Sequence, residues 1–162
     1  MAVLEPSPGK ITALLRDKLT KLGKGNSQTL TQGAQQSSFS GRYDLFIVTS
    51  NESNGESRPQ NLETKILLIP GDISPKIAAG ISSDWVVSYG LSGKDTITFS
   101  SLEPGFALLA LQRELVTLAG AVVEQQEIPL PFPRPLSSLE VMVLYASLLV
   151  LGIPPETLAI RE

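Results

Sequence analysis

The 162-residue sequence contains no cysteine and no histidine, so disulfides and zinc–thiolate sites are excluded, and the commonest general base and metal ligand are missing. Hydrophobic residues make up 42% and charged residues 18%, a balance typical of one globular domain over residues 1–162. A net charge of -3 at pH 7 carries no electrostatic signature of a nucleic-acid or membrane-surface partner.

The first part of the chain predicts a helix and a long loop. Apolar residues recur at helical spacing over residues 11–22, and Gly23 is a typical helix stop. Residues 24–41 are rich in Gly, Ser, Gln and Thr, which is typical of a loop, with one short strand near residues 29–31.

Three continuous apolar runs then predict strands covered on both faces, as in a parallel sheet. These runs are residues 43–48, 65–69 and 84–89. A short helix is expected over residues 75–81. Trp85 opens the third run, which predicts that this side chain lies in the core.

After Gly90 the pattern changes to antiparallel strands. Polar and apolar residues alternate over 96–101, and a turn signal at 103–105 precedes a returning strand at 106–112. A second hairpin is expected within residues 115–128.

The last part of the chain predicts a connector followed by a buried helix. Alternate prolines from Pro129 to Pro135 predict an extended segment without regular strand pairing. Ser137 and Glu140 form a capping box, and residues 138–151 are apolar on almost every side. Such a helix either packs inside the domain or forms a homodimer interface, and we favour internal packing because sheet-covering helices show this pattern.

This order of elements predicts an α/β fold. We expect a mainly parallel central sheet with flanking helices, in a three-layer Rossmann-like or P-loop-like arrangement, extended by an antiparallel hairpin. The N-terminus has no signal-peptide pattern, and the longest apolar segment, residues 139–151, is too short to span a bilayer. We therefore expect a cytoplasmic protein.

Three stretches together resemble the central domain of Mur ligases, the ATP-dependent enzymes that join amino acids to cell-wall precursors. Residues 87–93, leading into 95–98, are similar to the strand and glycine turn that precede the family's hairpins. Residues 146–156 are similar to its closing helix, which ends in Leu-Gly-Ile-Pro-Pro-Glu. Gly9-Lys10-Ile11-Thr12 is similar to the end of its phosphate loop.

The resemblance implies ATP at Gly9, Lys10 and Thr12, and a magnesium ion held by Glu52. The chain departs from the motif at several points. Pro6 and Pro8 have no backbone N–H to offer a phosphate, and Ile11 stands where the family has a Ser or Thr whose hydroxyl binds magnesium. The histidine that the family uses for magnesium is also missing. We therefore favour an ordinary helix start with a solvated lysine, and we expect no cofactor.

Gly90, Ser92 and Lys94 form a second candidate binding site. Ligands of open α/β sheets bind at the carboxyl ends of strands, where Lys94 and nearby N–H groups would contact an anion or a nucleotide. Turn chemistry alone also explains these residue types, as a surface turn with a solvated Lys94–Asp95 pair, and we favour this interpretation.

We expect a non-catalytic, Mur-ligase-like domain that acts through ligand binding or protein contacts. Its candidate partners are a second copy of the chain and a small molecule that is a nucleotide or is similar to a cell-wall precursor. The alternative is a small nucleotide-binding protein, or an ATP-dependent ligase-type enzyme, with a divergent phosphate loop.

Overall fold

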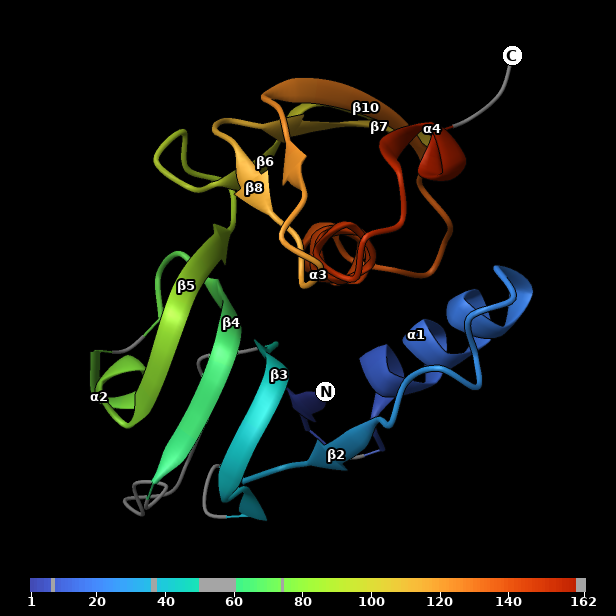
Figure 1. Ribbon diagram of the computed structural model, residues 1–162. Helices are drawn as coiled ribbons and strands as arrows, with labels where there is room; N and C mark the ends of the chain where they lie inside the picture. The colour runs from blue at the N-terminus through green and yellow to red at the C-terminus, as the bar shows by residue number, and fades with distance from the viewer. Residues whose placement is uncertain (7, 36–37, 50–60, 74, 160–162) are drawn as a thin grey trace. The chain divides into compact units, whose positions relative to one another are not determined.

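The computed structural model describes residues 1–6, 8–35, 38–49, 61–73 and 75–159 (Figure 1). The chain falls into two compact units, Met1–Val86 and Val87–Glu162. No helix among the described residues combines the length and the apolar character that crossing a membrane would require.

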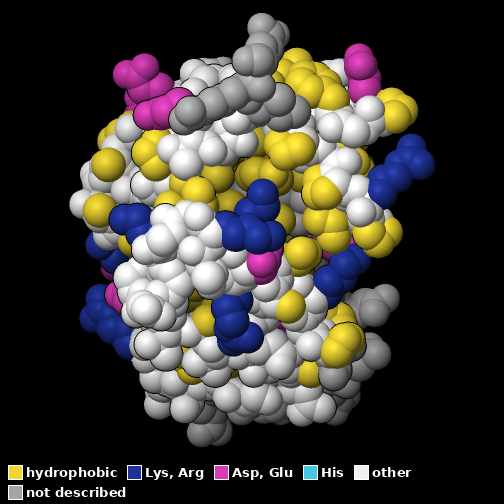
Figure 2. Space-filling view, turned by 90° about the vertical axis from the view of Figure 1, so that its right-hand side faces the viewer, with side chains coloured by type: hydrophobic (Ala, Val, Ile, Leu, Met, Phe, Trp, Pro, Cys, Tyr) yellow, Lys and Arg dark blue, Asp and Glu magenta, His cyan; other side chains and the backbone are white. Residues whose placement is uncertain are grey.

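The first unit is built from strands with parallel pairings and from two helices among its described residues. Its elements are β1 (Ala2–Leu4), α1 (Lys10–Lys21), β2 (Thr31–Gly33), β3 (Gly41–Val48), β4 (Leu62–Pro70), α2 (Pro75–Ala79) and most of β5 (Ile81–Tyr89). Strand β1 lies between β2 and β3, and β3 also pairs with β4. All three pairings are parallel. The face that carries α1 shows Lys and Arg side chains, with some Asp and Glu, among hydrophobic and neutral ones (Figure 2).

The core of the first unit explains why so short a strand as β1 is held in place. Ala2, Val3 and Leu4 are all buried, and Ala2 and Leu4 pair with Phe46 and Val48 of β3. The ring of Phe39 packs edge-on against Phe46 at 5.0 Å between centroids. Apolar burial of this kind supplies most of the stability of a small parallel sheet.

The second unit combines antiparallel strands with a buried helix. After the end of β5 it contains β6 (Ile97–Glu103), β7 (Phe106–Leu111), β8 (Leu115–Val116), β9 (Val122–Val123), β10 (Gln126–Pro131), α3 (Ser138–Val150) and α4 (Pro155–Leu158). Strands β6, β7 and β10 form one antiparallel set, and β8 and β9 form a separate hairpin.

Helix α3 is buried along most of its length, as its apolar sequence predicts. Every residue from Val141 to Val150 is buried, and Figure 1 shows α3 end-on beneath the strands of its unit. Its predicted capping box is confirmed: Ser137 Oγ accepts the Glu140 N–H at 3.2 Å, and Glu140 accepts the Ser137 N–H at 2.7 Å.

Hydrogen-bonded neighbours follow the order β10-β7-β6-β5-β4-β3-β1-β2, and β5 runs from the first unit into the second. The α/β class, the mostly parallel strand pattern and the antiparallel hairpin extension predicted from the sequence are therefore confirmed.

Two sequence predictions are wrong in an informative way. Pro129 and Pro131 lie inside β10 and pair with Leu108 and Phe106 of β7, although an unpaired connector was expected. Strand β10 ends the order of the described strands. The backbone nitrogens of two prolines spaced two residues apart both face the side where no described strand pairs, so their lack of an N–H costs no ladder hydrogen bond there. Trp85 was expected in the core, but its side chain is 53% exposed.

Candidate functional site

The start of α1 has the strand–loop–helix order that the sequence predicts for an anion site. Strand β1 ends at Leu4 and α1 begins at Lys10, whose side chain is exposed. Gly9 is the N-cap residue in the left-handed conformation, with φ of 85°, and a Cβ added at this position would lie 3.3 Å from the Gln32 side chain. A glycine is therefore required at this position by the backbone itself.

A carboxylate of the same chain fills this helix start. Glu5 is only 3% exposed, and its Oε2 accepts the Ile11 N–H at 2.7 Å while its Oε1 accepts the Thr12 N–H at 2.8 Å. The Thr12 hydroxyl also donates to Glu5 Oε1. The structure thus brings Gly9 and Thr12 together around Glu5, a residue that the sequence reasoning did not single out.

This arrangement satisfies the helix start chemically. The first N–H groups of a helix have no intrahelical partner and carry partial positive charge, so they favour an anion. Glu5 supplies that anion through charge-assisted hydrogen bonds, which are stronger than neutral ones. A phosphate at the same N–H groups would have to displace a buried carboxylate and then lie close to its charge.

The second predicted group lies in the turn after β5. Asp95 is 5% exposed and its Oδ2 accepts the Ser92 N–H at 3.1 Å. A Cβ on Gly90 would lie 2.5 Å from that same oxygen, so the turn closes around the carboxylate because residue 90 is glycine.

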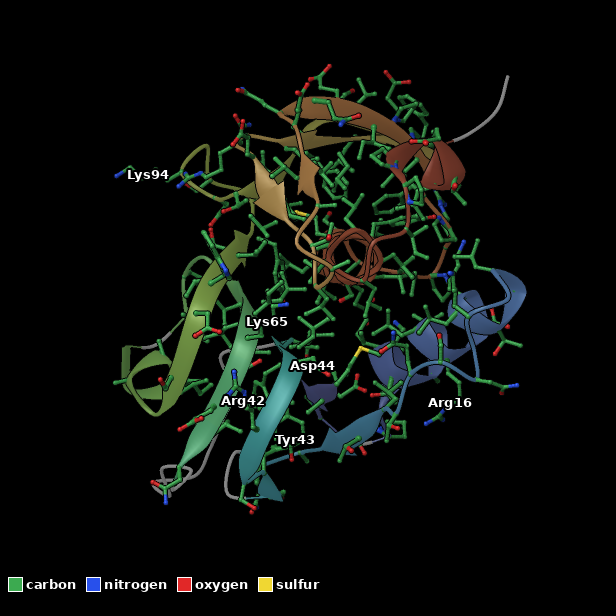
Figure 3. All side chains as sticks on the ribbon, viewed as in Figure 1. Arg16, Arg42, Tyr43, Asp44, Lys65 and Lys94 are labelled. Atoms are coloured by element: carbon green, nitrogen blue, oxygen red, sulfur yellow. The ribbon has the colours of Figure 1, made fainter. Side chains whose placement is uncertain are left out.

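Lys94 lies on the outer side of this turn. Its side chain is exposed and points outward (Figure 3), while its N–H donates to Ser92 Oγ at 3.2 Å. The Arg113 guanidinium donates to the Lys94 carbonyl at 2.6 Å and braces the turn. The predicted solvated Lys94–Asp95 pair is therefore wrong for Asp95, which is buried and holds the backbone.

The remaining predicted ligand, Glu52, lies outside the described residues. Within the described part of the chain, no group of three or more acidic side chains is arranged to hold a metal ion. The two predicted binding sites, at the start of α1 and in the turn after β5, thus share one feature. At each site, backbone N–H donors are paired with a carboxylate from the same loop.

A third feature emerges at the outer edge of β5 rather than from the predicted sites. Over Ile81–Val86 none of the described strands pairs on the side away from β4, because β6 joins β5 only at Tyr89↔Ile97. Figure 1 shows β5 on the outer side of β4. Trp85 and Val86, on opposite faces of this edge, are 53% and 55% exposed. The apolar run suggested burial, because the sequence does not reveal that the strand lies at an edge.

Comparison of the sequence with protein-family models and with curated proteins gives no match. A functional proposal for this chain therefore depends on its own residues.

Proposed function

We propose that the chain is a non-catalytic interaction domain that self-associates through the outer edge of β5. The observation that carries this proposal is the edge of Ile81–Val86, which none of the described strands pairs on the side away from β4, with its exposed Trp85. An open strand edge presents N–H and C=O groups in the pattern that a further strand pairs with.

The chemistry of this edge favours strand addition. Proteins usually protect an edge strand with lysine, proline or several charges. Residues 81–88 contain no Lys, Arg or Pro, and Asp84 is their single charged side chain. Trp85 and Val86 would each lose exposed apolar surface on pairing, one on each face of the extended sheet.

A second copy of the chain is the occupant that suits this edge. Two identical strands pair antiparallel about a two-fold axis, and two-fold dimers are the commonest oligomers. A register that sets Trp85 opposite its counterpart also sets Asp84 opposite Val86, so the two acids do not face each other directly. Cross-strand aromatic pairs of this kind add roughly 0.2–1 kcal/mol.

The non-catalytic part of the proposal is supported by Glu5. Its carboxylate takes the Ile11 and Thr12 donors that a nucleotide phosphate would use. The Mur-ligase resemblance enters the proposal as an architectural relationship, supported by the mostly parallel strand order and by the apolar closing helix. A Rossmann-like or P-loop-like ancestry belongs to the same proposal.

Self-association is tested by sedimentation together with the fluorescence of Trp85, the single tryptophan. We expect a concentration-dependent dimer and a blue shift of the emission as the indole becomes buried. Val86→Lys should keep the chain monomeric, whereas Val122→Lys should not, although Val122 is equally exposed at 56%. A wild-type chain that stays monomeric at all concentrations, or equal loss in both variants, would overturn the proposal.

The alternative, a nucleotide-binding protein, is favoured by one observation: the strand–loop–helix order of β1 and α1 with Gly9 between them. Thermal unfolding with Mg-ATP separates the two functions, because a ligand at a hundred times its Kd stabilises a protein by about 2.7 kcal/mol. We expect no stabilisation of the wild type. A stabilisation that Lys10→Ala abolishes would establish the alternative instead.

A further inference from the structure

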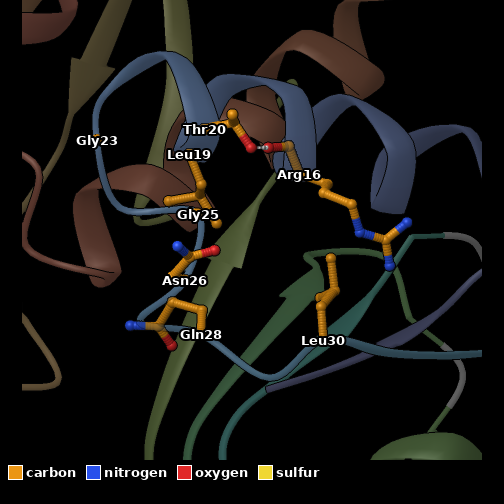
Figure 4. Close-up of a pocket in the computed structure, with 8 residues that line it drawn as sticks. All are labelled: Arg16, Leu19, Thr20, Gly23, Gly25, Asn26, Gln28 and Leu30. Atoms are coloured by element: carbon orange, nitrogen blue, oxygen red, sulfur yellow. Dashed lines mark hydrogen bonds between the residues drawn. The ribbon is translucent and has the colours of Figure 1, made fainter.

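We infer that a pocket beside α1 binds a small organic anion, recognised through the guanidinium of Arg16. The pocket lies wholly within the first unit, between the second half of α1 and the chain that returns from it (Figure 4). Its volume is about 510 Å³, which is the size of a typical small-molecule site. It is lined by Arg16, Leu19, Thr20, Gly23, Gly25, Asn26, Gln28 and Leu30.

The polar side chains of this pocket are available to a ligand. Arg16, Asn26 and Gln28 make no side-chain hydrogen bond or ion pair with any other described residue. The nearest acid in the sequence, Asp17, is engaged by Lys21 at 2.7 Å. A guanidinium offers a planar fork of donors that matches a carboxylate or a phosphate, and the two amides can pair with hydroxyl groups.

The local charge favours an anion, although the chain as a whole is acidic. Residues 10–24 contain five Lys or Arg and one Asp, in a chain of net charge -3. A concentration of one sign of charge beside a pocket attracts ligands of the opposite sign.

The pocket lies near the C-terminal end of α1, where the helix dipole repels an anion, so this repulsion must be compared with the attraction of Arg16. The end of α1 carries roughly half a negative charge at most, confined to its last turn. The carbonyls of Leu19 and Thr20 in that turn already accept the N–H groups of Lys24 and Gly23 at 2.7 and 3.0 Å. The full charge of Arg16 therefore dominates.

The shape of the pocket depends on the close return of the chain. A Cβ on Gly25 would lie 2.8 Å from Thr20 Oγ1 and 3.1 Å from its Cα, so a side chain at residue 25 would force Thr20 to shift. Gly23, with φ of 70°, makes the turn that leads there. Leu19 is buried and Leu30 half-buried, and both add apolar surface to the pocket lining.

The test uses three sugars of similar size: glucose 6-phosphate, gluconate and neutral glucose. Each is titrated into the full chain labelled with nitrogen-15, and the amide resonances of residues 16–30 are followed. We expect binding of at least one anionic sugar, with shifts centred on Gly23, Gly25 and Asn26, and no binding of glucose. The phosphate and carboxylate arms show which anion the site prefers.

Two variants of equal charge make the result specific. Arg16→Ala should weaken binding roughly tenfold or more, the effect of losing a charge-assisted hydrogen bond. Lys24→Ala removes the same charge just after α1, outside the pocket lining, leaves the Lys21–Asp17 pair intact and should change affinity far less. Absence of binding by both anions, shifts centred elsewhere, or equal weakening in the two variants would each overturn the inference.

Discussion

Two buried carboxylates, Glu5 and Asp95, do in this chain what a bound anion does in a phosphate site. Each is 5% exposed or less. Glu5 accepts the N–H groups of Ile11 and Thr12. Asp95 accepts the Ser92 N–H, and the missing side chain of Gly90 makes room for it. A buried charge is tolerated only when hydrogen bonds compensate its lost hydration, so these donors are committed to the fold.

Alanine substitutions of Gly90 and Gly93, in the turn after β5, should show whether stability depends on the close packing at Gly90 or on a general preference of the turn for glycine. Gly90→Ala places a methyl group 2.5 Å from Asp95 Oδ2, so the carboxylate must move and lose its bond to Ser92. We expect a loss of about 1–3 kcal/mol in the free energy of unfolding, measured in urea. Gly93→Ala meets nothing within 4 Å, and we expect a change within about 0.5 kcal/mol. Equal effects would show that Asp95 does not depend on the space at Gly90.

The candidate site could be predicted from the sequence only in part, for reasons that lie at this scale. Gly9 and Gly90 were recognisable because turns between a strand and the next element often need a backbone conformation or a close approach that only glycine allows easily. Glu5 was not, because its carboxylate reaches the N–H groups of residues six and seven positions later only through the path of the loop. A single sequence does not specify that path.

At the scale of elements, the sequence was sufficient to predict the helices and strands whose formation depends on nearby residues alone. Helical spacing of apolar residues predicted α1, and the capping box with its continuous apolar run predicted α3. Alternation predicted β6, and a turn signal predicted the turn at Gly105. Local patterns failed where a neighbour decides. Pro129 is compatible with β10 because, among the described strands, β10 pairs with β7 alone and has one side without a partner strand.

The capping box of α3 offers a test of how much a helix start contributes to this fold. Ser137→Ala removes the acceptor of the Glu140 N–H and leaves that donor without its side-chain partner. We expect a loss of about 1 kcal/mol in the free energy of unfolding, the usual value for an N-cap serine. The matched control is Ser138→Ala, inside the first turn, which should be close to neutral. A greater loss at Ser138 would mean that the capping geometry is not what orders the helix.

At the scale of the whole molecule, the sequence predicted the class of fold but not the place of each strand. The change from parallel to antiparallel pairing after Gly90 was visible as a change in hydrophobic pattern. The edge position of β5 over Ile81–Val86 was not, because strand order is set by contacts between distant segments. Trp85 was therefore predicted in the core, whereas its exposed side chain lies on the edge that we propose mediates self-association.

Alkaline unfolding should report on the core of the second unit through Tyr145. This side chain is 1% exposed in the middle of α3, and burial raises the pKa of its hydroxyl above the ordinary value of 10.0. Above pH 10 the unfolded chain therefore ionises this tyrosine more readily than the folded chain does, so its contribution to stability is lost as pH rises. The loss amounts to at most about 1.4 kcal/mol per pH unit.

Urea unfolding of wild type and Tyr145→Phe at pH 8 and pH 11 measures this contribution directly. Phenylalanine keeps the ring and cannot ionise, so the variant should lose less stability between the two pH values than the wild type. Comparing each protein with itself removes the effect of other groups that titrate in this range, because both chains share them. The same pH dependence in both proteins would mean that Tyr145 ionises equally well in the folded state, and that its burial does not exclude the phenolate.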